Sequence, residues 1–305
     1  MPNVLTVIQG LLWKRQKAPV TEVVRYYTKA PGTAYVLPAD EEEKQRLKLQ
    51  HAYSTRALGY MQAPVSLEDD DFVLESGAGT GDWVLEVAER QPKCVQFIGI
   101  DIESRLFPTQ TLIPSNVQFE VQSILNLPTD WTNKFKYIHQ RLLVVALRIA
   151  EWDRAIKEIH RVIQPGGWVE LVEIDQWVSG PVTDIAQSIF RQVAESRGTV
   201  PRPGVGNALK KRLEESGFVN IHIGVHSTPL GEWAGEDGRD CKNSTLSVLR
   251  GIKPRVLEAG GFNLVDNGDM YDDLLKRVEE EMNSIPGGRV EWVVAYAQKR
   301  SAELS

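Results

Sequence analysis

Three glycines spaced two residues apart, Gly77, Gly79 and Gly81, are the residues of this chain best suited to holding a ligand. They follow the apolar run Phe72 to Leu74 and precede a helical pattern that starts near Asp82. Glycine has no Cβ, so it adopts positive φ at little cost and lets the backbone approach a ligand closely. A strand, a glycine turn and a helix in this order predict a loop that binds a nucleotide-like molecule.

Two carboxylates indicate the charge of that molecule. Glu75 stands two residues before the first glycine, where it would repel a pyrophosphate and attract a sulfonium or an ammonium. The dinucleotide pattern G-x-G-x-x-G would also need a glycine at the position of Asp82. Asp101 ends the next predicted strand, where a carboxylate can accept hydrogen bonds from both hydroxyls of a ribose. These features favour S-adenosylmethionine over a dinucleotide.

Strands and helices alternate around this loop, a pattern typical of a parallel sheet with helices on both faces. The predicted strands are 72–76, 94–100, 117–121, 136–140, 168–174, 218–226 and 291–298, with helices over 81–90 and near 151–163. We therefore predict an α/β fold with a Rossmann-like, mostly parallel sheet of seven strands.

The chain divides into a cap and a main domain in this interpretation. Residues 1–65 form an N-terminal helical cap, in which the acids of Asp40 to Glu43 suit the positive end of a helix. Residues 66–305 form the sheet domain, with helical insertions at about 178–216 and 230–290. The second insertion precedes the last strand and would cover the carboxyl edge of the sheet as part of an acceptor pocket, or else be a solvated surface excursion.

Composition excludes several classes of protein. The 305 residues carry a net charge of -6 with a pI near 5.5, and Lys and Arg do not cluster with aromatic residues, which argues against a nucleic-acid partner. The two cysteines, Cys94 and Cys241, are too few for a disulfide framework, and Cys94 is expected in a buried strand. We predict reduced thiols in a cytoplasmic protein.

The amino-terminal stretch Val4 to Trp13 is apolar but short. Basic residues follow it rather than precede it, which is the wrong order for a secretory signal, and no segment reaches transmembrane length. We interpret it as a helix packed on the domain or on a second copy in a homodimer, with a peripheral membrane role as the alternative.

No set of side chains predicts a metal site. Glu170 and Glu173 are three residues apart on a predicted strand, so they point to opposite faces. His222 and His226 share a strand face without convincing ligand spacing.

Several longer motifs resemble one family. The run Val73 to Gly81, with the order of the elements, resembles the class I S-adenosylmethionine-dependent methyltransferases. A narrower resemblance, over nearly the whole chain, is to the fungal LaeA-like methyltransferases. The matching motifs are Tyr35 to Glu43, Arg46-Leu47, Gln50-His51, Gly79 to Trp83, Tyr137 to Arg141, Pro165 to Glu173, Pro229 to Trp233 and Ala295 to Lys299.

The resemblance implies a place for each part of the cofactor. The methionine end would lie over Glu75, Gly77, Ala78 and Gly79, and the ribose on Asp101. The adenine would lie between Ile102 and the turn Ser123-Ile124-Leu125. The family often has Asp where Ser123 stands, and a serine hydroxyl lacks the charge assistance of a carboxylate. Gln140 and His139 would face the sulfonium and the methyl acceptor.

Methyl transfer is an in-line displacement, so positioning can supply most of the catalysis. A weakly acidic acceptor gains from a base, and His51 and His139 are the candidates for a base or an acceptor-positioning group. The alternatives are a core histidine for His139 and, for His51, a tie between the N-terminal segment and the cofactor site.

Aromatic residues are the candidates for the acceptor pocket. Tyr27 and Tyr35 precede the sheet, and Trp177 and Trp233 follow it, although aromatic residues also simply fill cores. We expect a methyltransferase for a small organic acceptor, with oxygen as the first guess and sulfur or nitrogen next. The alternative is a LaeA-like regulator of secondary metabolism that binds the cofactor and acts through protein partners. The absence of a long basic or low-complexity tail favours the enzyme.

Overall fold

A computed structural model describes residues 25–28, 35–199 and 203–301. The stretch Val4 to Trp13, and with it the prediction of a packing or pairing helix, lies outside the described residues. The strands are β1 (Phe72–Ser76), β2 (Gln96–Asp101), β3 (Val117–Val121), β4 (Phe135–Arg141), β5 (Ile163–Val178), β6 (Phe218–Pro229) and β7 (Arg289–Lys299). The helices are α1 (Glu41–Leu58), α2 (Asp82–Arg90), α3 (Ile149–Val162), α4 (Pro181–Ser196), α5 (Val205–Glu215), α6 (Gly235–Glu258) and α7 (Gly268–Ser284).

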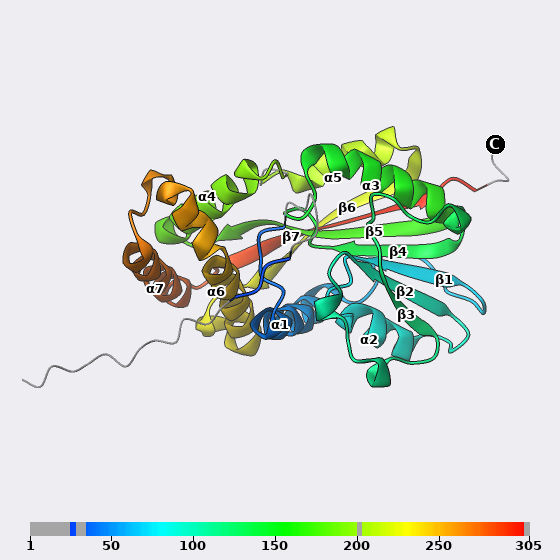
Figure 1. The fold of residues 1–305 in the computed structure, drawn as a ribbon, viewed down its shortest axis with the longest axis horizontal. Helices are drawn as coiled ribbons and strands as arrows, with labels where there is room; N and C mark the ends of the chain where they lie inside the picture. Colours follow the sequence, from blue (N-terminus) through cyan, green and yellow to red (C-terminus); the bar gives the residue numbers. More distant parts are fainter. Residues whose placement is uncertain (1–24, 29–34, 200–202, 302–305) are drawn as a thin grey trace, which may run out of the picture.

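The strands form one seven-stranded sheet in the order β3-β2-β1-β4-β5-β7-β6. β1 to β5 are parallel to one another, whereas β7 is antiparallel to both β5 and β6. Figure 1 shows α3 and α5 on one face of the sheet and α1 and α2 on the other. The predicted α/β class, with a mostly parallel sheet and helices on both faces, is confirmed.

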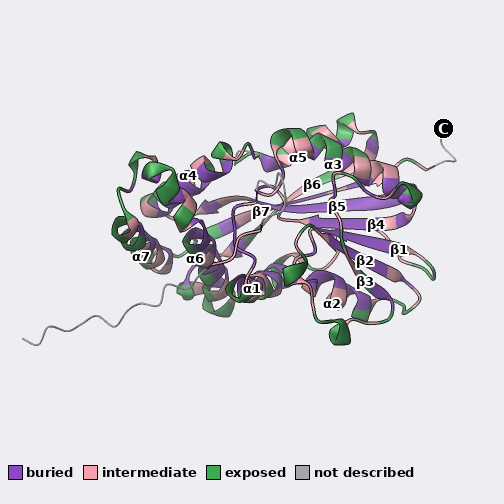
Figure 2. Ribbon diagram, viewed as in Figure 1, coloured by how far each residue is buried: buried purple, intermediate pink, exposed green. Residues whose placement is uncertain are grey.

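Burial explains why the central strands form. Val73 and Leu74 in β1, and Tyr137 and Ile138 in β4, have no exposed surface, as expected for parallel strands covered on both faces. Figure 2 shows the same distribution, with buried residues along the strands and exposed residues on the outer faces of the helices. The carboxyl ends of β1, β2 and β4 therefore meet at one edge of a rigid sheet.

The helix α1 begins where its acids predict. The side chain of Asp40 accepts a hydrogen bond from the backbone N–H of Glu43 at 3.1 Å, and Arg25 donates to Asp40 at 2.7 Å. This N-cap satisfies one of the free donors of the first turn. The helix then packs along α6, so the residues just before the sheet cover its carboxyl edge.

The stretch predicted to be helical over 178–216 contains two helices, α4 and α5, and β5 extends to Val178 along its antiparallel partner β7. The strand predicted over 291–298 is β7, which lies inside the sheet with β6 at the edge. One prediction needs correction. Cys94 is not in a buried strand, because β2 begins at Gln96; its thiol donates to the carboxylate of Asp69.

The insertion at 230–290 is mostly helical. Its helices α6 and α7 pack against each other and against α4 at one end of the molecule (Figure 1). Leu249 and Ile252 of α6 are fully buried, so this segment is a packed part of the fold and not a solvated excursion. Within the described ranges, no helix has the length and apolar character to cross a bilayer.

Candidate active site

A cavity of about 490 Å³ opens at the carboxyl ends of β1, β2 and β4. Its walls come from the glycine loop before α2, from α1, and from the segment 142–147 that follows β4. Volumes of this size are typical of small-molecule sites. Most of the predicted site residues line it: Tyr35, His51, Glu75, Gly77, Ala78, Gly79, Asp101, Ile102, Ser123, Ile124 and Trp177.

The glycine loop needs its glycines for both conformation and space. Gly77 has φ +69° and Gly79 has φ +52°, in the left-handed region that side chains rarely adopt. A Cβ on Gly77 would also lie 2.8 Å from Cδ2 of Leu143. The loop is thus a cradle that any side chain would fill.

Asp101 holds the open end of this loop. One oxygen accepts from the backbone N–H of Gly79 and the other from that of Glu103, both at 2.9 Å. Burial raises the pKa of Asp101, and these backbone donors act in the opposite direction. The carboxylate is therefore fixed at the cavity wall with lone pairs still available to a ligand.

Glu75 is a buried carboxyl group with an unsatisfied atom. Only 4% of the residue is exposed, and Oε2 has no hydrogen-bond partner among the described residues. Burial raises the pKa of Glu75 to about 8, and the nearby Arg141 guanidinium opposes this rise. A cation in the cavity would provide the missing partner. This orphaned oxygen fits the predicted sulfonium or ammonium.

Arg141 is the main site residue that sequence reasoning did not assign. Its guanidinium lines the cavity and donates to Oγ of Ser54 at 3.1 Å and to Nδ1 of His51 at 3.0 Å, both neutral acceptors. No carboxylate of the described residues forms an ion pair with it, and burial lowers its pKa. The cavity thus contains a partly buried cation, Arg141, and a buried carboxyl group, Glu75, that form no ion pair with each other.

The surroundings of His51 determine whether its ring is charged. Its ring lines the cavity, with Nδ1 facing Arg141 and also 3.4 Å from Oγ1 of Thr55. Nε2 lies 3.3 Å from Oε2 of Glu86. Burial and then Arg141 lower the pKa of His51, whereas Glu86 raises it. His51 is therefore a mainly neutral ring at neutral pH.

His139 and Gln140 are not among the residues that line the cavity, contrary to the prediction for the end of the fourth strand. The His139 ring stacks on Trp83 with centroids 3.9 Å apart, and Nδ1 is 3.7 Å from Oε1 of Glu75. Burial lowers the pKa of His139 well below its usual value. Gln140 is fully buried on the opposite face of β4. The strand reaches the cavity one residue later, at Arg141.

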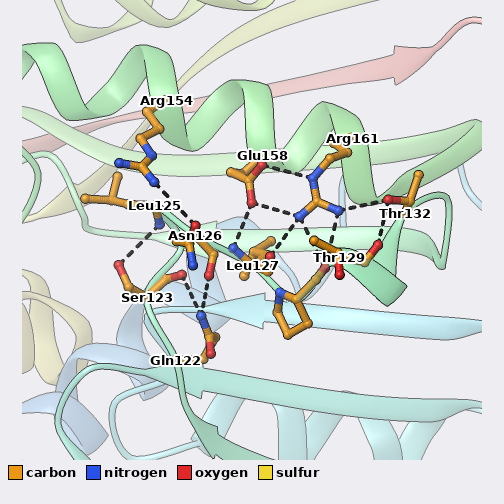
Figure 3. A network of polar contacts seen from close by, with 11 residues as sticks. Gln122, Ser123, Leu125, Asn126, Leu127, Thr129, Thr132, Arg154, Glu158 and Arg161 are labelled. Carbon is orange, nitrogen blue, oxygen red and sulfur yellow. Dashed lines mark hydrogen bonds and ion pairs between the residues drawn. The ribbon is translucent and has the colours of Figure 1, made fainter.

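The turn predicted to contact adenine is held by helix α3 (Figure 3). Oγ of Ser123 accepts from the backbone N–H of Leu125 at 3.2 Å and so closes the turn. Glu158 accepts from the N–H of Leu127 at 2.7 Å, and Arg161 donates to the Leu127 carbonyl at 3.0 Å. An ion pair between Glu158 and Arg161 at 2.8 Å joins these two contacts.

The end of the cavity around Trp177, where the acceptor pocket is predicted, is mostly apolar. Trp177 packs against Phe190 with ring centroids 5.2 Å apart, and Ile174 and Val248 line the same region. The segment 142–147 adds leucine and valine side chains.

Two of the four predicted aromatic residues lie elsewhere. Tyr27 donates its hydroxyl to the carbonyl of Gly251 on α6, and its neighbour Thr28 lines the cavity instead. Trp233 lies in a short turn before α6, is 39% exposed, and donates to the carbonyl of Leu230. Tyr27 and Trp233 therefore pack outside the cavity and do not line it.

The two glutamates of β5 are structural anchors. Glu173 is buried and accepts from the backbone N–H groups of Leu143 and Val144 at 2.9 and 3.2 Å, which fixes the segment 142–147. Glu170 accepts from the N–H groups of Gln62 and Ala63 at 2.7 and 2.9 Å. They act on opposite faces, as expected. Among the described residues, no group of three or more His, Cys, Asp or Glu side chains could hold a metal ion.

The fold and the cavity together define an α/β enzyme of the class that binds a nucleoside cofactor over the carboxyl ends of parallel strands. A family model described as a methyltransferase domain matches residues 73–167. The chain is 30% identical to the N-methyltransferase tcpN of Claviceps purpurea, over 86% of this chain and 95% of that protein. It is 33% identical to the N-methyltransferase sirN of Leptosphaeria maculans, over 82% of this chain and 90% of that protein.

A solved structure shares the fold. A chain from the complex of the Trm112 methyltransferase activator of Haloferax volcanii with a methyltransferase matches with a TM-score of 0.50 and 13% identity. The match covers 86% of this chain and 96% of that chain. The protein described here belongs to the class I S-adenosylmethionine-dependent methyltransferases. It is a methyltransferase, and S-adenosylmethionine is its cofactor.

Proposed function

We propose that this enzyme methylates a nitrogen atom of a small, largely apolar metabolite. The observation that carries the choice of atom is the alignment, over nearly their whole length, with relatives named N-methyltransferases. Oxygen, the first guess from sequence, has no comparable support. The apolar walls around Trp177 and Phe190 support an acceptor with a sizeable hydrocarbon surface.

We also propose which residue contacts each part of the cofactor. Oε2 of Glu75, which has no hydrogen-bond partner among the described residues, would receive the ammonium of the methionine end. The guanidinium of Arg141, which has only neutral hydrogen-bond partners there, would receive the carboxylate. Gly77, Ala78 and Gly79 would lie beneath it, and Asp101 would accept from the ribose. Ile102, Ser123 and Ile124 would surround the adenine. When bound, the cofactor supplies a methyl group already activated by its sulfonium.

The chain's own residues would then orient the acceptor and exclude water. Glu173 fixes the backbone of 142–147, so that segment forms a firm wall opposite α1. Leu47, Gln50 and His51 of α1 line the cavity, which supports the proposed role of residues 1–65 as a cap over the site. Holding both reactants in line is the main catalytic contribution expected of such a site.

The test is a release assay for S-adenosylhomocysteine with acceptors that differ only in the accepting atom. An aniline, a phenol and a thiophenol with the same ring system, together with an indole and a secondary amide, would be supplied with methyl-deuterated cofactor. We expect mass spectrometry to find the label on nitrogen. Label on oxygen or sulfur alone would overturn the choice of atom.

The same experiment distinguishes an enzyme from a LaeA-like regulator of secondary metabolism. We infer catalysis rather than regulation because the cavity has a large apolar acceptor side next to the cofactor side. A regulator needs only the cofactor side. Tight cofactor binding by calorimetry without turnover of any acceptor, in the panel or in a fungal metabolite extract, would favour the regulator.

A further inference from the structure

His51 and Glu86 form a pair outside the residues that we propose to contact the cofactor. His51 lies on α1 and Glu86 on α2, with Nε2 3.3 Å from Oε2. The His51 side chain is 6% exposed and that of Glu86 is 41% exposed. His51 lines the cavity, whereas Glu86 is not one of its lining residues. The pair therefore extends from the cavity wall to the protein surface.

The neighbours of the His51 ring determine which nitrogen carries the proton. Arg141 donates to Nδ1, and a guanidinium cannot accept a hydrogen bond. Nδ1 must therefore hold the lone pair, and the single proton of the neutral ring lies on Nε2, toward Glu86. His51 and Arg141 both line the cavity, so the lone pair on Nδ1 points toward another residue of the cavity wall.

We propose that His51 accepts the proton released by the acceptor nitrogen and that Glu86 positions His51 for this role. The inference rests on the proposed N-methylation. A nitrogen that exchanges its hydrogen for a methyl group releases one proton, and Nδ1 takes that proton as the acceptor N–H replaces the Arg141 contact. Nε2 has no hydrogen bond within the described residues, and the Glu86 carboxylate 3.3 Å away stabilises the imidazolium by its charge. The imidazolium loses its extra proton to water when the product leaves.

The charges around His51 give the proposal a pH signature. Arg141 of β4 lowers the pKa of His51, and Glu86 and Asp82 of α2 raise it; His139 of β4 is a further titratable neighbour. Replacing Glu86 by a neutral group removes a stabilising charge from the imidazolium, so the pKa of His51 falls. The acidic limb of the kcat profile then moves to lower pH, while its plateau falls because the base is weaker.

One arm of the test needs no acceptor. Nitrogen-15 NMR of the full chain, assigned with His51→Asn, should show the Nε2–H tautomer, and Glu86→Gln should lower the pKa of His51. Glu89→Gln removes the same charge from an exposed position of the same helix and should leave that pKa unchanged. An Nδ1–H tautomer, or an unchanged pKa in Glu86→Gln, would overturn the proposal.

The second arm uses the nitrogen acceptor that turns over in the matched panel. Glu86→Gln should lower kcat about tenfold and shift the acidic limb to lower pH, with unchanged cofactor affinity. Glu86→Asp should restore most of the rate. N-methylation with an unmoved acidic limb in Glu86→Gln would overturn the role of His51 and Glu86 alone. Absence of N-methylation would overturn the proposed function and this proton step with it.

Discussion

The cofactor side and the acceptor side of the cavity are built on different principles. On the cofactor side, single polar groups such as Glu75 and Asp101 stand at the ends of strands, where the sheet fixes them. On the acceptor side, apolar side chains come from α4, α6 and the segment 142–147. A constant ligand can be recognised by a few fixed charges and hydrogen bonds, whereas a variable one is selected by the shape of a pocket.

The largest expected effect is on the cofactor side, at Asp101. Asp101→Ala should weaken S-adenosylmethionine binding about tenfold or more, because it removes the proposed acceptor for the ribose and releases two backbone donors. Isothermal titration calorimetry measures the affinity. Asp101→Asn keeps the size and one oxygen, so its affinity should be intermediate. Unchanged affinity in Asp101→Ala would remove the ribose assignment.

A second effect on the cofactor side should depend on pH. Since burial raises the pKa of Glu75 to about 8, the group is mostly protonated at pH 6 and must release that proton to pair with a cation. The affinity of the wild type relative to Glu75→Gln should therefore rise with pH up to about 8 and then level off. At pH 8 the variant should bind about tenfold more weakly. A ratio that does not change with pH would contradict the ion pair.

Glu75 should have the opposite pH effect on the stability of the ligand-free protein: its contribution to the free energy of unfolding should fall as pH rises. The pKa of Glu75 rises from 4.5 to about 8 on folding, so folding retains a proton between these values. The free energy of unfolding should thus fall as pH increases from about 4.5 to about 8. Glu75→Gln lacks this contribution, and urea unfolding at pH 5 and pH 8 should show a flatter profile for the variant. An equally steep profile in both proteins would exclude Glu75 as the source.

A smaller effect should be confined to the acceptor side. Phe190→Leu keeps an apolar side chain but removes the ring that packs on Trp177, and it should raise the KM of the acceptor about fivefold. Cofactor affinity should remain within about twofold, because Phe190 is not among the residues that we propose to contact the cofactor. Steady-state kinetics and calorimetry measure the two quantities. A parallel loss of cofactor affinity would show that the two sides are not independent.

The fold, and the presence of Glu75, the glycines and Asp101 in one cavity wall, were largely predictable because their signals are local. The glycines, the acid before them and the acid ending β2 lie within one βαβ unit, where spacing along the chain is also spacing in the structure. The start of α1 was predictable from Asp40 for the same reason.

The rest depended on register and on contacts between distant segments. Adjacent strand residues face opposite sides, so placing the end of β4 one residue early assigned His139 and Gln140 where Arg141 belongs. Trp233 and Trp177 look alike in sequence, but only three-dimensional packing places Trp177 in the pocket and Trp233 outside it. The cavity wall formed by α1, α4 and α6 has no counterpart in any single motif.

Helix α3 acts as a spacer between the two sides of the cavity. Its first turn carries Glu151, which lines the cavity, and two turns later Glu158 holds the turn 123–127. Seven residues of helix span about 10 Å, a length that cannot change without unwinding a turn. The enzyme can therefore acquire a new acceptor pocket by changing α4, α6 or the segment 142–147 while the place of the methyl donor stays fixed. One residue inserted into α3 would instead rotate Glu158 away from the turn 123–127, our proposed adenine contact, whatever acceptor the pocket then held.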